Sequence, residues 1–160
     1  MRSWLGTNVF PELPAELRNV IVSVDKETNN TGKTGDKAAV TTTSDKLWLL
    51  SLAEVGGSVA ANTLPAGCMY PADTYNAEGS QYQVFSDARV SGDSDNAELV
   101  RVFKGSQENG IVVQGEACPW WLRSLGMTWT AGFAAVDAQG NPMNAWITDH
   151  DIGVVAGFRL

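Results

Sequence analysis

The sequence predicts a loop-rich domain of the all-β or α+β class. Charged residues make up only 18% of the chain, against about a quarter in a typical soluble domain. Sixteen glycines and six tryptophans accompany many Thr, Ser and Asn residues, whereas a helical bundle would carry more Glu, Lys and Leu. The C-terminal part divides into extended segments separated by turn sequences. We therefore expect one domain over residues 1–160, which is long enough to bury a substantial core.

The first third predicts a helix, a strand and a long loop. Pro11 and Pro14 favour a short helix at residues 15–18, because proline suits the first helical turn. A β-branched run predicts a strand at residues 20–24. The Thr-, Asn- and Gly-rich residues 27–44 predict a long polar loop.

A strand followed by a capped helix is predicted next. Residues 45–50 have the composition of a strand. Ser51 and Glu54 follow with the S-x-x-E spacing of a capping box, and Gly56-Gly57 favours the end of that helix. Further downstream we expect a helix and two strands, at residues 81–89, 99–103 and 110–113.

The last forty residues predict an antiparallel meander. Its extended segments are residues 120–124, 131–136, 143–148 and 153–159. Turn sequences at Gly126, at residues 138–141 and at residues 149–151 separate them.

The first of these segments, Trp120-Trp121-Leu122-Arg123-Ser124, is the expected hub of the fold. Adjacent residues of a strand point to opposite faces, so the two indoles should enter different environments. Arg123 carries a permanent charge that needs carboxylate, carbonyl or aromatic partners. We interpret the segment as a scaffold strand with Arg123 and one indole buried. The alternative is a site in which an exposed indole stacks on a sugar or peptide.

Net charge excludes some partners. The chain carries −7 with a pI near 4.5, so it lacks the basic surface that nucleic acid or an anionic membrane would need. No run is long enough for a membrane span, and the opening residues lead into no signal core. Cys68 and Cys118 have no histidine cluster or second pair beside them, so we expect no metal site. A disulfide and two free thiols both remain open.

Catalytic machinery is not visible in the sequence. His150 is the single histidine, and no Ser or Cys nucleophile is spaced for a triad with it. Residues 93–98 gather carboxylate and amide oxygens but lack the glycine and terminal glutamate of an EF-hand. Both stretches are best interpreted as solvated turns. We expect neither an enzyme nor a bound cofactor.

Four blocks carry a resemblance over nearly the whole chain. They are Arg2-Ser3-Trp4-Leu5, the DKLWLLS block with Glu54 (residues 45–54), WWLRS (residues 120–124) and Gly157-Phe158-Arg159. Their order resembles a bacterial domain family of unknown function, common in gut Gram-positive genomes and their prophages. The ending is also similar to formylglycine-generating-enzyme-like domains and phage variable receptor-binding proteins. This resemblance implies an α+β, C-type-lectin-like fold with a mostly antiparallel sheet, short flanking helices and long irregular loops.

The same resemblance implies a non-enzymatic domain that binds a protein or glycan on a cell surface. Its setting would be extracellular, a cell surface or a virion, and the domain would be the C-terminal part of a longer protein. The alternatives are a formylglycine-generating-enzyme-like oxidoreductase, whose closely spaced cysteine pair has no match here, and a purely structural module. The implied ligand face lies in the C-terminal loops, at Trp129, Thr130, Asn141, Asn144, Trp146, Thr148, Asp149 and His150.

Overall fold

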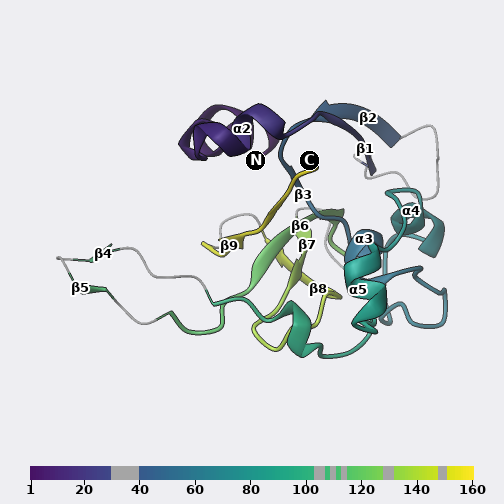
Figure 1. The fold of residues 1–160 in the computed structure, drawn as a ribbon. Helices are drawn as coiled ribbons and strands as arrows, with labels where there is room; N and C mark the ends of the chain where they lie inside the picture. The colour runs from purple at the N-terminus through teal and green to yellow at the C-terminus, as the bar shows by residue number, and fades with distance from the viewer. Residues whose placement is uncertain (30–39, 103–106, 109–110, 113–114, 128–131, 148–150) are drawn as a thin grey trace.

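The computed structural model describes residues 1–29, 40–102, 107–108, 111–112, 115–127, 132–147 and 151–160. Short helices and mostly antiparallel strands confirm the α+β class (Figure 1). The helices are α1 (Arg2–Trp4), η1 (Leu5–Val9), η2 (Phe10–Glu12), α2 (Ala15–Val20), α3 (Leu52–Gly56), α4 (Ala72–Asn76), α5 (Gln83–Asp87) and η4 (Ala97–Leu99). The strands are β1 (Val24–Asn29), β2 (Val40–Asp45), β3 (Trp48–Leu49), β4 (Gln107–Glu108), β5 (Ile111–Val112), β6 (Trp120–Leu125), β7 (Gly132–Val136), β8 (Asn144–Ile147), β9 (Gly153–Val154) and β10 (Ala156–Gly157).

The largest sheet has the strand order β8-β7-β6-β9. Strands β6, β7 and β8 are antiparallel neighbours, as predicted, but β9 pairs with β6 in parallel through Trp120 and Gly153. The meander prediction is therefore wrong at its last step. Residues 153–159 also divide into β9 and β10, and β10 pairs with the distant strand β3. Turn residues specify only local reversals, so they could not reveal these long-range pairings.

The two tryptophans of β6 enter different environments, as predicted. Trp120 is fully buried in the main core, where its Nε1–H donates to the carbonyl of Leu99 at 3.0 Å. Trp121 is 7% exposed and packs in a second, smaller core with Leu5 and Leu49. This strand therefore joins both hydrophobic cores, and both indoles are buried, whereas the sequence predicted the burial of one.

The first third differs most from the prediction. The helix after Pro14 is confirmed as α2, but it continues to Val20, and β1 begins only at Val24. The strand predicted at residues 20–24 is therefore wrong. The predicted polar loop is also wrong at both ends, because β1 and β2 form a hairpin whose register runs from Val24↔Asp45 to Asn29↔Val40. Its β-branched threonines fit a pleated strand, which the polar composition concealed.

The predicted capping box is confirmed at α3. The N–H of Glu54 donates to the Ser51 hydroxyl at 3.1 Å, and the Glu54 carboxylate accepts the N–H of Ser51 at 3.0 Å. Gly57 ends the helix with φ = +83°, a conformation that glycine adopts without strain.

The remaining central predictions are met in part. Helix α5 occupies the middle of the helix expected at residues 81–89, and β5 lies within residues 110–113. The strand predicted at residues 99–103 is wrong for residues 99–102, which are the part of it that the structure describes. Leu99 instead ends η4, and Val102 makes an isolated bridge to Ala117.

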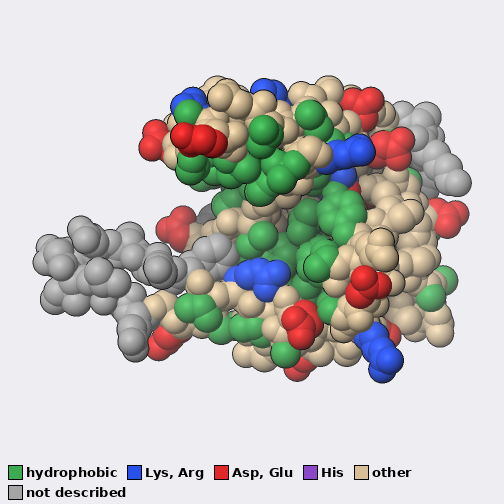
Figure 2. Space-filling model, in the orientation of Figure 1, with side chains coloured by type: hydrophobic (Ala, Val, Ile, Leu, Met, Phe, Trp, Pro, Cys, Tyr) green, Lys and Arg blue, Asp and Glu red, His purple; other side chains and the backbone are tan. Residues whose placement is uncertain are grey.

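The N-terminal helices pack on the smaller core. Leu5 is fully buried there, and Val9, Phe10 and Leu13 pack against it. Figure 2 shows hydrophobic side chains gathered along the lower edge of these helices and across the hollowed centre of this face. The two ends of the fold meet where the N–H of Val22 donates to the carbonyl of Arg159 at 3.0 Å. Among the described residues, no helix has the length and apolar character needed to cross a membrane.

Candidate functional site

One face of the β1–β2 hairpin forms a polar wall. In its register Lys26 stands opposite Thr43, and Thr28 stands opposite Thr41. Directly opposite residues of antiparallel strands present their side chains to the same face, and Asp45 follows Thr43 at the next position on that face. These five residues all line one pocket.

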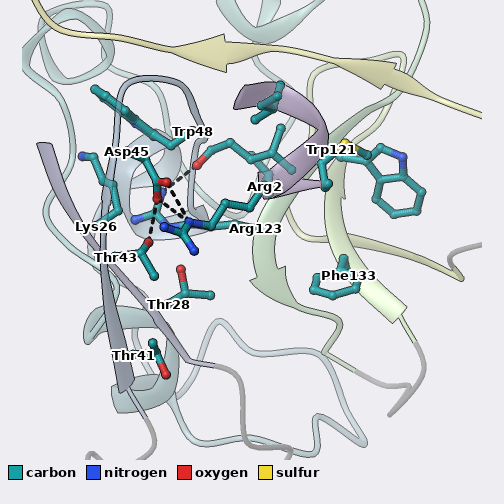
Figure 3. A pocket seen from close by; sticks show the side chains of 14 residues that line it. Arg2, Lys26, Thr28, Thr41, Thr43, Asp45, Trp48, Trp121, Arg123 and Phe133 are labelled. Atoms are coloured by element: carbon teal, nitrogen blue, oxygen red, sulfur yellow. Dashed lines mark hydrogen bonds and ion pairs between the residues drawn. The ribbon is translucent and has the colours of Figure 1, made fainter. Parts of the chain in front are cut away.

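The pocket has a volume of about 580 Å³, within the range of small-molecule sites. Its opposite wall is apolar and includes Trp121 and Phe133 from the main sheet and Leu5 from the N-terminal helices. Figure 3 shows Lys26, Thr28, Thr41 and Thr43 on the hairpin side, with Trp121 and Phe133 across from them. Phe133 is 40% exposed, so its ring is accessible from solvent. One wall can thus form hydrogen bonds while the other offers ring and hydrocarbon surface.

Buried charges connect the hairpin to the sheet behind the polar wall. Glu54 accepts hydrogen bonds from Lys26 Nζ at 2.8 Å and from the Tyr82 hydroxyl at 2.9 Å, and it also pairs with Arg123. The Lys26 ammonium lies 4.4 Å from the centre of the Trp48 ring, where the negative ring face attracts it. Burial alone would raise the pKa of Glu54, but hydrogen bonds and charge from Arg123, together with Lys26, hold that pKa below its ordinary value.

Arg123 joins three segments of the backbone. Its guanidinium donates to the carbonyls of Glu27 at 3.1 Å, Leu49 at 2.8 Å and Glu78 at 2.7 Å, besides Glu54. The register between β6 and β7 shifts around this residue, and the N–H of Arg123 donates to Leu50 instead. The prediction that Arg123 is buried against carboxylate and carbonyl partners is confirmed. Arg123 therefore supports the pocket wall from the side of the protein interior.

A second buried carboxylate, Glu78, lies beyond Arg123. It accepts the N–H of Asn29 at 3.0 Å and the hydroxyl proton of Ser124, whose oxygen accepts the N–H of Leu52 at 2.8 Å. Burial raises the pKa of Glu78 to about 7, and these hydrogen bonds and Arg123 oppose that rise. Glu78 therefore changes charge near neutral pH while holding β1 to β6.

An ion pair closes the hairpin side of the pocket. Arg2 Nε donates to both carboxylate oxygens of Asp45, at 2.7 and 2.8 Å, and the Thr43 hydroxyl donates to the same carboxylate at 2.6 Å. Arg2 belongs to α1, so this pair fastens the N-terminal helices to the end of β2. Its side chain is largely exposed, which makes this the pocket's outer edge.

Most of the ligand face predicted from the sequence falls outside the described residues: Trp129, Thr130, Thr148, Asp149 and His150. Asn144 and Trp146 belong to β8, where Trp146 occupies the register position opposite Phe133. Asn141 lies in the preceding turn, and its carbonyl and N–H both bond to Asp137. The prediction for these eight residues stays a prediction.

The cysteines and the acidic turn have simple structural roles. Cys68 and Cys118 are free thiols, and the Cys68 thiol donates to the carbonyl of Tyr70. Asn96 organises the turn at residues 91–96 through hydrogen bonds to Ser91 and Ser94. In the part of the chain that the structure describes, no group of three or more His, Cys, Asp or Glu residues is placed to hold a metal ion.

A family model described as a domain of unknown function, DUF6273, matches residues 1–159. The chain belongs to this family. The match confirms the expectation of a family of unknown function that spans nearly the whole chain. Searches of curated proteins and of solved structures found no match for this DUF6273 domain.

The site of this DUF6273 domain includes residues of two sequence blocks that were interpreted as scaffold and not as a site. The DKLWLLS and WWLRS blocks contribute Asp45, Trp48, Trp121 and Arg123 to the pocket lining. The threonines of the hairpin were missed because residues 27–44 were interpreted as a loop, and Lys26 was missed because it lay between that loop and the strand predicted at residues 20–24. The continuous β-branched run Val40-Thr41-Thr42-Thr43 was the signal that could have revealed a strand there.

Proposed function

We propose that this chain is a non-enzymatic binding domain that holds part of a protein or glycan partner in the pocket between the β1–β2 hairpin and the main sheet. The observation that carries the proposal is the pocket's two-sided chemistry. Threonine hydroxyls line one wall, and Trp121 and Phe133 line the other, across a ligand-sized volume. Such sites combine apolar contact area with a few polar groups that fix orientation.

The rigidity of the polar wall supports recognition. Lys26 and Arg123 are held by Glu54 from behind, and Asp45 is held by Arg2. Side chains that are already ordered lose little conformational entropy when a ligand binds. A preformed wall of this kind suits a binding domain.

Two further parts of the proposal concern fold family and setting. We propose a C-type-lectin-like arrangement, which the mostly antiparallel sheet and short flanking helices support. The domain would then act outside the cell, on a cell surface or on a phage particle. The predicted ligand face at the C-terminal loops would adjoin the pocket through β7 and β8, because Phe133 and Trp146 are register partners.

A binding screen tests the proposal directly. The full chain is displayed against a glycan array and a peptide library, beside the variants Thr28→Trp and Thr42→Trp. The indole of Thr28→Trp should fill the pocket, while Thr42 lies on the outward face of the same hairpin and is the matched control. We expect ligands that bind the wild type and Thr42→Trp to bind Thr28→Trp at least about tenfold more weakly.

Three results would each overturn part of this assignment. If Thr28→Trp bound ligands as tightly as the wild type, the pocket would take no part in recognition. If alanine at Asn141, Asn144 and Trp146 abolished that same binding, the site would move to the C-terminal loops. Chemical turnover of a bound ligand would contradict the non-enzymatic part.

A further inference from the structure

Arg2 keeps most of its hydrogen-bonding capacity. A guanidinium carries a fork of N–H donors, and within the part of the chain that the structure describes Arg2 uses only Nε, on the carboxylate of Asp45. The two terminal nitrogens make no contact there, and the side chain is 60% exposed while it lines the pocket. Arg2 can therefore bind a second acceptor without releasing Asp45.

The other two basic residues of the lining are committed to the protein itself. The Lys26 ammonium donates to Glu54 and to the Tyr82 hydroxyl. Arg123 donates from all three nitrogens, to Glu54 and to three backbone carbonyls. An acceptor that enters the pocket thus finds its strongest available donor in Arg2.

The threonine hydroxyls are less available than this guanidinium. Thr43 already donates to Asp45, and Thr41 has a partner of its own. The polar contact that this wall offers a ligand therefore comes mainly from Arg2, with Thr28 beside it.

The charges at the pocket favour a negative group. Three basic residues line it, against the carboxylate of Asp45 and that of Glu54 behind the wall, which leaves one positive charge in excess. Met1 also lines the pocket, and an ammonium at its position would add to this excess. The chain as a whole carries −7, but salt screens distant charges beyond about 8 Å, so the nearby charges dominate.

The shape of the free donor group and the opposite wall describe the ligand. Asp45 occupies the Nε edge of Arg2, so the end formed by Nη1 and Nη2 is open, and its two parallel N–H groups match the two oxygens of a carboxylate. Figure 3 shows Arg2 beside Asp45, with Trp121 and Phe133 on the sheet side. The fitting ligand carries a carboxylate close to a large apolar group.

We infer that the pocket takes the C-terminal residue of a partner peptide, with its carboxylate on Arg2 and its apolar side chain against Trp121 and Phe133. One terminal residue carries both groups on the same Cα, so they enter together. In an extended internal segment, an acidic residue and its apolar neighbour point to opposite sides. This inference rests on the proposed function and narrows its partner to a protein with an exposed chain end.

The first test varies the ligand. Pentapeptides that end in phenylalanine, leucine or tryptophan are titrated into the full chain by calorimetry, each as the free acid and as the C-terminal amide. We expect at least one free acid to bind and its amide to bind about fivefold or more weakly. A free acid that ends in serine should also bind more weakly. The titrations are run below the Glu78 pKa of about 7, where Glu78 adds little negative charge behind Arg123.

The second test varies the protein. Arg2→Gln removes the fork, so the free acid and its amide should bind this variant equally. Arg159→Gln, at an exposed position outside the pocket lining, is the matched control and should keep the wild-type preference for the free acid. Circular dichroism first confirms that each variant is folded.

The outcomes separate this inference from the proposed function. Equal binding of acid and amide by the wild type, or a preference that survives Arg2→Gln, would overturn the carboxylate assignment. An amidated peptide with an internal glutamate beside phenylalanine that binds as tightly as the free acid would overturn the chain-end assignment. If Thr28→Trp blocks a glycan while no free-acid peptide binds, the inference is overturned and the binding function stands. If Thr28→Trp changes the binding of no glycan or peptide, both proposals fail together.

Discussion

Arg123 and Glu54 form an ion pair in the interior, although they are 69 positions apart in the sequence. Arg123 is 8% exposed and Glu54 is 2% exposed, so each charge depends on its partner rather than on water. Glu54 also caps its own helix, and Arg123 also holds three carbonyls. The pair therefore locks α3 to β6 and supports the pocket wall.

Arg123→Lys should destabilise the protein strongly. A single ammonium cannot reach Glu54 and the three carbonyls that the planar guanidinium reaches, so buried acceptors lose their donors. We expect the free energy of unfolding to fall by roughly 2–5 kcal/mol in urea titrations. Arg159→Lys, at an exposed position, is the control and should change it by less than about 0.5 kcal/mol. A similar small change at Arg123 would mean that its network contributes little.

Trp120→Ala should open a cavity in the main core. Trp120 is fully buried, and the substitution also removes the donor to the Leu99 carbonyl. We expect a loss of roughly 3–5 kcal/mol in unfolding free energy. Trp4→Ala removes an indole that is 46% exposed and should cost less than about 1 kcal/mol. Comparable losses for the two variants would contradict the assignment of β6 as the core strand.

Because of Glu78, the stability of the protein should depend on pH at values above those at which carboxylates ordinarily titrate. Its pKa in the folded state is about 7, against an ordinary value of 4.5, so the folded protein binds a proton that the unfolded chain releases. The stability that this proton contributes is fully present below pH 4.5 and is lost as the pH rises through about 7. Glu54, whose pKa is lowered, acts in the opposite sense, and its contribution is lost as the pH falls below about 4.5.

Glu78→Gln isolates the first effect, because a neutral amide cannot titrate. Relative to this variant, the wild type should lose about 3 kcal/mol of unfolding free energy between pH 4.5 and about 7. Urea titrations across this range measure the difference. Glu16→Gln, at an exposed position, is the control, and its unfolding free energy should depend on pH as that of the wild type does. If the unfolding free energy of Glu78→Gln shows the same pH dependence as that of the wild type, Glu78 does not titrate between pH 4.5 and about 7.

Gly140→Ala should be far more damaging than Gly67→Ala. Both glycines have positive φ, at +87° and +83°, so both substitutions incur the same backbone strain of roughly 1–2 kcal/mol. A Cβ at Gly140 would lie 2.0 Å from the carbonyl oxygen of Asn96, whereas a Cβ at Gly67 meets no atom within 4 Å. Thermal unfolding should separate the two variants clearly. Equal midpoints would contradict the close packing of the β7–β8 turn against residues 91–96.

Local signals in the sequence predicted local structure well. The capping box of Ser51 and Glu54 and the different environments of Trp120 and Trp121 each depend on neighbours within a few residues, and both are confirmed. Pairings between distant segments were not predictable in this way. The parallel contact of β9 with β6 and the salt bridge of Lys26 with Glu54 depend on how the whole chain packs.

The pocket itself illustrates the same limit. Its polar wall requires the β1–β2 register, and its apolar wall requires β7 and the N-terminal helices to face that hairpin. Polar composition predicted a loop where threonines form strands, because hydrophobic periodicity is weak in Thr-rich segments. Arg123, in contrast, was identifiable from sequence, since a charged residue within an aromatic strand must find partners.

Chemical-shift mapping tests the central claim that this pocket is the recognition site. Backbone amide resonances of the full chain are followed while the tightest ligand from the array and library screens is titrated. We predict that the largest changes occur at Lys26, Thr28, Thr43 and Phe133, and that Thr28→Trp abolishes them. Saturating changes confined to other residues, with these four amides unmoved, would contradict it.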